Sequence, residues 1–283
     1  MNCTVCDNEG SSTMFIKNNF PIVECNRCKH AFTAYIPTPE KIREIYSDDY
    51  FFKGGTGYAN YILEKNMLIK RGEYYARKVS NLVMGGNMLD VGAAAGFILK
   101  GFENKGWHGM GIEPNKSMVD FARKEVEVNV QQGTLETMDT EEKFDLISII
   151  QVMAHLYNLN KSLKRINFFL KPKGYVLIET WDKDSVTAKL FGKHWHEYSP
   201  PATLNYFSRK SLERLMNKHK FKLVKQGTPR KSINSSHAKS LIQHKLSESK
   251  SLRLLKPFTY LIPGNLILPY PSEDLFWALY QKK

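Results

Sequence analysis

Apolar residues gather in short continuous runs along the middle of the chain. Three runs cover residues 88–91, 107–112 and 144–151, and a fourth covers 175–180. Strands buried on both faces of a parallel sheet have this continuous pattern, whereas half-exposed strands alternate. The stretches between the runs have the length and spacing of helices. The pattern therefore predicts an α/β fold in which helices cover a mostly parallel sheet.

The remaining elements follow from the same pattern and from cap and turn residues. Asn115 and Ser208 are suited to cap helices, because their side chains accept hydrogen bonds from free backbone N–H groups. Residues 171–174, Lys-Pro-Lys-Gly, are expected to form a turn. Helices are predicted over 60–82, 97–104, 115–125, 160–170 and 208–218, and further strands over 127–131, 221–225 and 274–281.

A loop almost without side chains follows the first apolar strand. Gly92 and Gly96 bracket three alanines, so backbone N–H groups can approach a ligand closely. The next helix begins at this loop and points its N-terminus toward it. Glu113 ends the second strand, where an acid accepts hydrogen bonds from both hydroxyls of a ribose. Its distance along the chain from Asp90 is close to the roughly 20 residues expected between such a loop and a ribose-binding acid.

Two classes of cofactor use this arrangement. A dinucleotide requires G-x-G-x-x-G, but here Asp90 precedes the first glycine and would repel a pyrophosphate. An acid suits a cofactor that carries an amino group. Residues 90–96 resemble motif I of the class I S-adenosylmethionine (SAM) methyltransferases, and residues 111–114 resemble their ribose-binding strand end. Ala94 stands where that family more often has glycine, and alanine is tolerable there if the residue has a negative φ. The alternative is an ordinary βαβ unit that binds nothing.

This resemblance implies a Rossmann-like fold with a seven-stranded, mostly parallel sheet whose last strand is antiparallel. It also implies SAM as the cofactor. In the family an Asp often binds the adenine amino group at the position of Thr134, so here Thr134 or neighbouring backbone would have to serve. The residues expected to bind SAM are Asp90, Gly92, Ala93, Gly96, Glu113, Pro114, Thr134, Leu135, Gln151 and Tyr58.

All four cysteines lie near the start of the chain, as two C-x2-C pairs separated by 18 residues. This spacing is within the range of four-thiolate zinc sites. Because a segment this short cannot bury a hydrophobic core, a bound metal would have to stabilise it. With four thiolates the ion has no open position, and the zinc would be structural; disulfides or a redox pair are the alternatives. The predicted ligands are Cys3, Cys6, Cys25 and Cys28, with His30 expected beside the site.

We expect three parts along the chain. Residues 1–35 would form the zinc knuckle, 36–84 a helical arm or lid, and 85–283 the methyltransferase domain, with insertions at about 182–207 and 227–272. Thr38 is suited to cap a short helix over 39–46. Tyr58 and Tyr61 lie among glycines and aromatic residues, where they either contact a ligand or pack on the main domain.

Two histidines are candidate general bases. His155 follows the predicted strand over 144–151, and ligands of open α/β sheets bind outside the carboxyl ends of strands. A histidine can take a proton at neutral pH, as methylation of a hydroxyl or an amine requires. His155 could instead be structural, capping the next helix. His196 lies in the first insertion, which we expect to cover the acceptor pocket.

The N-terminal run as a whole resembles one methyltransferase subgroup, in which a four-cysteine knuckle, a proline linker and an Asp-Tyr-Phe arm precede motif I. Members are often associated with modifying sugars. The resemblance implies a saccharide or related small metabolite as acceptor, including glycans of cell-surface polysaccharides. An RNA base methyltransferase is less expected, because no Asn/Asp-Pro-Pro-Tyr/Phe motif follows the predicted strand over 144–151. A non-catalytic SAM-binding scaffold is the third alternative.

The net charge of +13 indicates either an anionic partner or simply a lysine-rich surface. There is no apolar run typical of a signal peptide, and no run of 18 apolar residues that would span a membrane. We therefore expect a cytoplasmic protein. Residues 237–271 combine basic and apolar positions, so they could lie on a membrane near a lipid-linked substrate, or pack on the protein.

Overall fold

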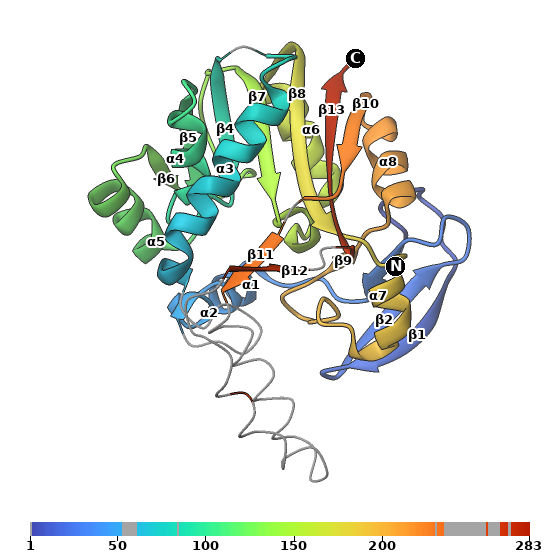
Figure 1. Ribbon diagram of the computed structural model, residues 1–283. Helices are drawn as coiled ribbons and strands as arrows, with labels where there is room; N and C mark the ends of the chain where they lie inside the picture. The colour runs from blue at the N-terminus through green and yellow to red at the C-terminus, as the bar shows by residue number, and fades with distance from the viewer. Residues whose placement is uncertain are drawn as a thin grey trace.

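The computed structural model describes residues 2–52, 61–83, 85–229, 231–234, 259, 267–270 and 273–283. A seven-stranded sheet forms the centre of the molecule, as predicted (Figure 1). Its strands, in order across the sheet, are β10 (Phe221–Gly227), β13 (Leu275–Lys282), β8 (Leu170–Trp181), β7 (Phe144–Ile150), β4 (Asn87–Val91), β5 (His108–Glu113) and β6 (Val130–Gln132).

Strands β8, β7, β4, β5 and β6 are parallel, whereas β13 runs antiparallel to both β8 and β10. The mostly parallel sheet with an antiparallel last strand is therefore confirmed. Among the described residues, no helix combines the length and apolar character needed to cross a membrane.

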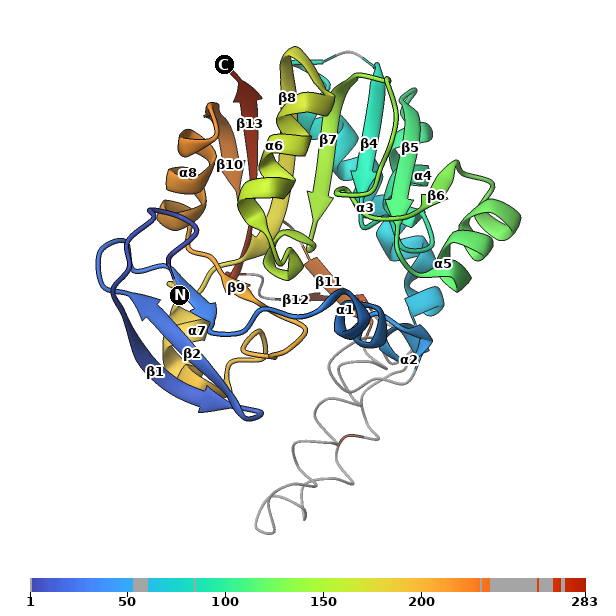
Figure 2. The same ribbon diagram turned by 180° about the vertical axis from the view of Figure 1, so that it is seen from behind.

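Helices cover both faces of this sheet. Helices α3 (Lys65–Val79), α4 (Phe97–Glu103) and α5 (Lys116–Phe121) lie on one face (Figure 1). Helices α6 (Leu159–Phe169) and α8 (Arg209–Lys218) lie on the other (Figure 2). Gly72 and Gly101 allow α3 and α4 to pack closely, because a Cβ at either position would meet backbone of the other helix at 2.2 Å.

Some predicted elements differ from the structure. The helix expected over 60–82 is a 3₁₀ turn, η1 (Tyr61–Glu64), followed by α3. The helix expected over 115–125 is α5 followed by a π-helix, η2 (Ala122–Val126). Glu127 ends it with φ +59°, a left-handed conformation that a strand does not accept, so β6 starts only at Val130.

The turn expected at 171–174 is part of the long strand β8. Pairing between β7 and β8 shifts there, from Phe144 opposite Leu170 to Leu146 opposite Tyr175. Lys173 takes a φ of +60°. The Lys-Pro-Lys-Gly residues without a partner on β7 thus form a bulge within β8, and the strand continues beyond them.

The N-terminal cysteine segment has a sheet of its own. Strands β1 (Ser11–Lys17), β2 (Phe20–Cys25) and β3 (Ala31–Thr33) are antiparallel, and β3 pairs on its other edge with β9 (Asn205–Tyr206). The segment before β9 contains α7 (Val186–Phe191) and the 3₁₀ turn η4 (Gly192–His194). These two parts share a small core of buried apolar residues: Ile22, Ala31, Ala188, Trp195, Tyr198 and Tyr206.

The arm between this sheet and α3 lies beyond the carboxyl ends of the central strands (Figures 1 and 2). It forms α1 (Pro39–Ile45), capped by Thr38 as predicted, and α2 (Asp48–Phe52). Asp48 accepts hydrogen bonds from the side chains of Asn115 and Ser117, both at 3.0 Å. The arm is thereby fastened to the start of α5.

A two-stranded antiparallel sheet of β11 (Lys231–Asn234) and β12 (Ile267–Tyr270) completes the described structure. Tyr58 and most of residues 237–271 lie outside the described residues, so the predictions made for them have no structural counterpart here.

Candidate functional site

A cavity of about 170 Å³ opens where the carboxyl ends of β4, β5 and β7 meet the arm. Ligands of parallel α/β sheets bind at this edge. The 3₁₀ turn η3 (Met153–His155) follows β7 there. The predicted site residues that line the cavity are Gly92, Glu113, Pro114, Thr134, Leu135, Gln151 and His155.

The glycine loop forms one wall, and its conformation differs from the expectation in one respect. Gly92 and Gly96 have φ values of +70° and +74°, where glycine is favoured. Ala94 has a φ of +45°, so the negative φ that would make alanine tolerable at this position is not observed. An L-residue in this conformation costs about 1–2 kcal/mol. The conformation lets the Ala94 backbone N–H donate to Glu113 Oε2 at 3.0 Å, which ties the loop to the end of β5.

Glu113 lies at the floor of the cavity and is only 4% exposed. Besides the bond from Ala94, its Oε1 accepts from the backbone N–H of Asn115 at 2.9 Å. Burial raises the pKa of Glu113 to about 7, although these two N–H groups favour the ionised form. The carboxylate is thus held in a fixed orientation with lone pairs left for a ligand.

Asp90 lies behind the loop and does not line the cavity. Its Oδ1 accepts a hydrogen bond of 2.6 Å from the hydroxyl of Ser148 on β7. Burial raises its pKa to about 7, and the nearby charge of Glu113 adds to the rise. Ala93 and Gly96 are also set back from the cavity lining. Any effect of Asp90 on a ligand in this cavity would therefore pass through the loop backbone or through its charge.

A buried ion pair that the sequence pattern did not predict lies beside Gln151. The carboxylate of Glu179, on β8, is fully buried and accepts from the guanidinium of Arg71 on α3 at 2.6–3.0 Å. The hydroxyl of Tyr75 donates to the same carboxylate. An acid inside the apolar run 175–180 was the sequence signal for this pair, because buried acids are almost always paired.

The Gln151 side chain takes its orientation from that pair. Its Nε2 donates to Glu179 Oε1 at 3.1 Å, and its backbone N–H donates to the Glu179 carbonyl at 2.8 Å. Gln151 also has a φ of +58°. Because a carboxylate only accepts, the amide nitrogen must face Glu179. The amide oxygen is the end that remains for a ligand in the cavity.

His155 is held by the segment that leads into β9. Its Nδ1 lies 2.8 Å from the carbonyl oxygen of Ala202, which can only accept, so Nδ1 carries the proton and Nε2 the lone pair. Burial lowers the pKa of His155, while the carbonyls of Ala202 and Gln151 oppose the shift. A neutral imidazole with a lone pair on Nε2 is the form a general base needs.

Aromatic side chains of the arm cover the cavity. Tyr46, Tyr50, Phe51 and Tyr61 all line it. Tyr61 also stacks on Phe97, with ring centroids 5.6 Å apart, so it contacts both the cavity and the main domain. Burial raises the pKa of the Tyr50 hydroxyl, which stays neutral at physiological pH.

His196 does not line this cavity. Its ring packs edge-on against Trp181 at 4.4 Å, and its Nδ1 lies 4.0 Å from Asp274 Oδ2. It is 50% exposed and lies among the residues between β8 and β9. Of the two predicted bases, the structure brings only His155 to the cavity.

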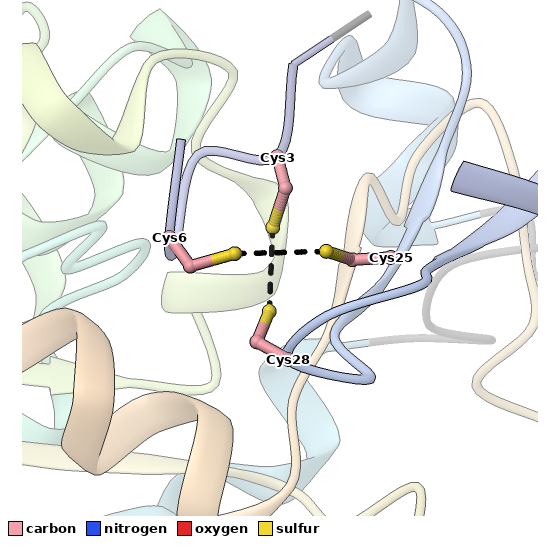
Figure 3. A group of neighbouring side chains, drawn as sticks. All are labelled: Cys3, Cys6, Cys25 and Cys28. Carbon is pink, nitrogen blue, oxygen red and sulfur yellow. Dashed lines mark hydrogen bonds between the residues drawn. The ribbon is translucent and has the colours of Figure 1, made fainter. Parts of the chain in front are cut away.

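The four cysteines form a compact cluster (Figure 3). All four Sγ atoms lie within 4.8 Å of one another, with Cys3 and Cys28 at 3.5 Å and Cys6 and Cys25 at 3.6 Å. A tetrahedral ion with Zn–S bonds of about 2.3 Å separates its sulfurs by about 3.8 Å. None of these thiols forms a disulfide, and burial raises the pKa of Cys28 to about 11. The donor set therefore fits a zinc ion, which would have to displace protons. His30 is buried between Phe32 and Phe207.

Comparison with known proteins agrees with this geometry. A family model described as a methyltransferase domain matches residues 67–226, more than half of the chain. That range includes the loop, Glu113, Gln151, His155 and the Arg71–Glu179 pair.

Several curated relatives match over a shorter stretch. The ubiquinone biosynthesis O-methyltransferase of Bradyrhizobium sp. (strain ORS 278) is 29% identical over 112 residues, 38% of this chain and 44% of that protein. The protein of the same name from Rickettsia typhi is 25% identical over 147 residues, 45% of this chain and 59% of that protein. The chain thus spans about half the length of these relatives.

Solved structures share the fold. A SAM-dependent methyltransferase from Archaeoglobus fulgidus superposes with a TM-score of 0.52 at 16% identity, covering 83% of this chain and 98% of that one. One from Thermotoga maritima has a TM-score of 0.50 at 20% identity, covering 78% and 94%. At these identities the likeness supports the fold alone.

Proposed function

The chain belongs to the methyltransferase-domain family, and from that premise we propose that it transfers a methyl group from SAM to a hydroxyl group of a small molecule. One observation carries the proposal: Glu113, the glycine loop, Gln151 and His155 all face one cavity beneath the arm. An acid suited to bind a ribose and a neutral imidazole therefore line the same small cavity.

The residues present fit SAM. Glu113 has lone pairs available for the ribose hydroxyls, and Gly92 and Ala94 of the loop line the cavity beside it, where the amino acid part would lie. Thr134 and Leu135 would contact the adenine. When bound, SAM supplies a methyl group that its sulfonium already makes electrophilic. Positioning should therefore supply most of the catalysis.

His155 would act as the general base that accepts the proton of the acceptor hydroxyl. In this proposal the acceptor hydroxyl loses its proton to His155 Nε2 as its oxygen is methylated. The contact between Nδ1 and Ala202 stabilises the imidazolium that forms, as a second partner does in other histidine bases. A general base of this kind contributes about 10²–10⁴-fold to the rate.

The acceptor class follows from two lines of support. The resemblance of the N-terminal run to sugar-modifying methyltransferases favours a saccharide or a related metabolite, and aromatic side chains can stack on a sugar ring. A phenolic hydroxyl is the second candidate. The aromatic lining of the cavity favours it, and the relatives named ubiquinone biosynthesis O-methyltransferase carry the same core. A nucleic acid base is less favoured, and a scaffold without activity is the remaining alternative.

Labelled SAM tests the proposal directly. Calorimetry should show SAM binding, and label should enter a phenol or a saccharide in a panel of acceptors. His155→Gln should retain SAM binding and lose about 10²-fold or more in kcat. The matched control is His108→Gln, at an exposed histidine at the start of β5. Absence of SAM binding by the wild-type protein would refute the proposal, whereas binding with no label transferred to any acceptor would favour the scaffold.

A further inference from the structure

Residues Ala202 to Tyr206 lie between the cysteine knuckle and the cavity, and they bond to both. We call this stretch the connecting segment. On the knuckle side, Tyr206 pairs with Ala31 and Asn205 pairs with Phe32, so the segment ends as the fourth strand of the knuckle sheet.

Thr33 makes the tightest contacts on that side. Its backbone N–H donates to the carbonyl of Leu204 at 2.9 Å, and its hydroxyl donates to the carbonyl of Thr203 at 3.0 Å. The hydroxyl of Tyr206 lies 3.0 Å from the Thr33 hydroxyl and also donates to Thr203. Both Thr33 and Tyr206 are almost fully buried, so water does not compete for these bonds.

On the cavity side, the same segment holds η3. The backbone N–H of Leu204 donates to the carbonyl of Ala154 at 3.0 Å, and Asn205 Nδ2 donates to the carbonyl of Leu156 at 2.9 Å. These bonds fix the residues on either side of His155. The Ala202 carbonyl accepts both from His155 Nδ1 at 2.8 Å and from the Tyr46 hydroxyl at 2.9 Å.

We infer that the cysteine knuckle is a positioning element of the active site, acting through Thr33 and the connecting segment to set the orientation and tautomer of His155. The knuckle sheet holds the segment, the segment holds η3, and the Ala202 carbonyl keeps the proton on Nδ1. This inference rests on the role proposed for His155. It extends that role, because the metal bound by the four cysteines then bears on the reaction without contacting a substrate.

The test reads the imidazole itself. Nitrogen NMR of ¹⁵N-histidine-labelled protein reports the tautomer of each ring, and His155→Gln identifies the signals of His155. We expect a protonated Nδ1 in the wild-type protein. Thr33→Val removes the hydroxyl but keeps the shape of the side chain. It should give a mixture of tautomers and lower kcat by up to about 10²-fold, with SAM binding unchanged. Removing the metal with a chelator should change the same signals.

The matched control is Thr13→Val, at an exposed threonine of β1 in the same sheet, which should leave the His155 signals and kcat as in the wild type. If Thr33→Val does not fold, Tyr206→Phe removes the neighbouring hydroxyl and tests the same junction. Wild-type His155 signals after both Thr33→Val and metal removal, in protein that still binds SAM, would overturn the inference. If instead His155→Gln keeps full activity, the proposed base is wrong, and the tautomer measurement still decides whether the knuckle positions the ring.

Discussion

Replacing Arg71 with methionine removes one partner of the buried ion pair beside Gln151. Methionine keeps an unbranched apolar side chain on α3 but has no guanidinium. Glu179 is fully buried, and it would then keep only the Tyr75 hydroxyl and the Gln151 amide as donors. Neither of these two remaining donors carries a positive charge that would balance the Glu179 carboxylate.

The contacts set the expected size of the effect. Arg71 makes three hydrogen bonds of 2.6–3.0 Å to the Glu179 carboxylate. Breaking a buried pair by removing one partner costs about 3–5 kcal/mol. Because two neutral donors remain, we expect a loss of about 3 kcal/mol in the free energy of unfolding, at the lower end of that range.

Urea unfolding followed by circular dichroism measures this loss. Arg77→Met is the matched control on the same helix, since Arg77 is 59% exposed and lies 3.6 Å from Glu73. Exposed pairs of this kind contribute about 0–1 kcal/mol. The double variant Arg71→Met/Glu179→Gln should recover most of the stability, because no unpaired charge is left in it.

Two results would contradict this reasoning. Arg71→Met could match Arg77→Met in stability, or the double variant could be no more stable than Arg71→Met alone. Either would mean that the charge of Glu179 is balanced by groups other than Arg71. The SAM affinity of Arg71→Met should fall as well, because the orientation of Gln151 depends on Glu179.

Three further predictions follow from the loop, its acid and the cysteines. Ala94→Gly should raise the free energy of unfolding by about 1 kcal/mol in thermal unfolding, because glycine removes the strain of an alanine in the left-handed conformation. The control Ala95→Gly, at a position without positive φ, should lower the free energy of unfolding. Equal effects of the two substitutions would refute the strain argument. Burial raises the pKa of Glu113 from 4.5 to about 7, so the folded chain holds the carboxyl proton more tightly than the unfolded chain does. The protonated Glu113 therefore contributes stability that is fully present below pH 4.5 and is lost as the pH rises through 7. Glu113→Gln should therefore lose less stability than wild type between pH 5 and pH 8, and the exposed control Glu9→Gln should match wild type; an unchanged pH dependence in Glu113→Gln would contradict the assignment. Metal analysis should find one zinc per chain, and chelation should lower the melting temperature; metal-free protein of unchanged stability would rule out a structural ion.

Much of the fold could be predicted because its signals are local. The apolar runs predicted the strands of the parallel sheet, and the glycine loop with Glu113 predicted the edge of the sheet where the cavity opens. The cysteine spacing indicated a cluster that the structure brings together. Each of these signals is local along the chain, where spacing and strand direction fix the geometry.

The parts that could not be predicted depend on long-range contacts or on backbone conformation. Lys173 and Glu127 have positive φ values, which no simple sequence pattern predicts for a lysine or a glutamate. The pairing of Arg71 with Glu179 joins residues 108 positions apart. His196 was expected near the acceptor because it follows a strand, but the segment that carries it packs instead on the knuckle sheet.

The pairing of β3 with β9 bears on how the chain is made. Thr33 and Thr203 are 170 positions apart, so the fourth strand of the first sheet is synthesised long after the other three. Until then, β3 has an unsatisfied edge that other chains could join. An ion bound early by the cysteines would stabilise this three-stranded sheet until β9 is synthesised, and the supply of metal during translation would then favour correct folding over aggregation.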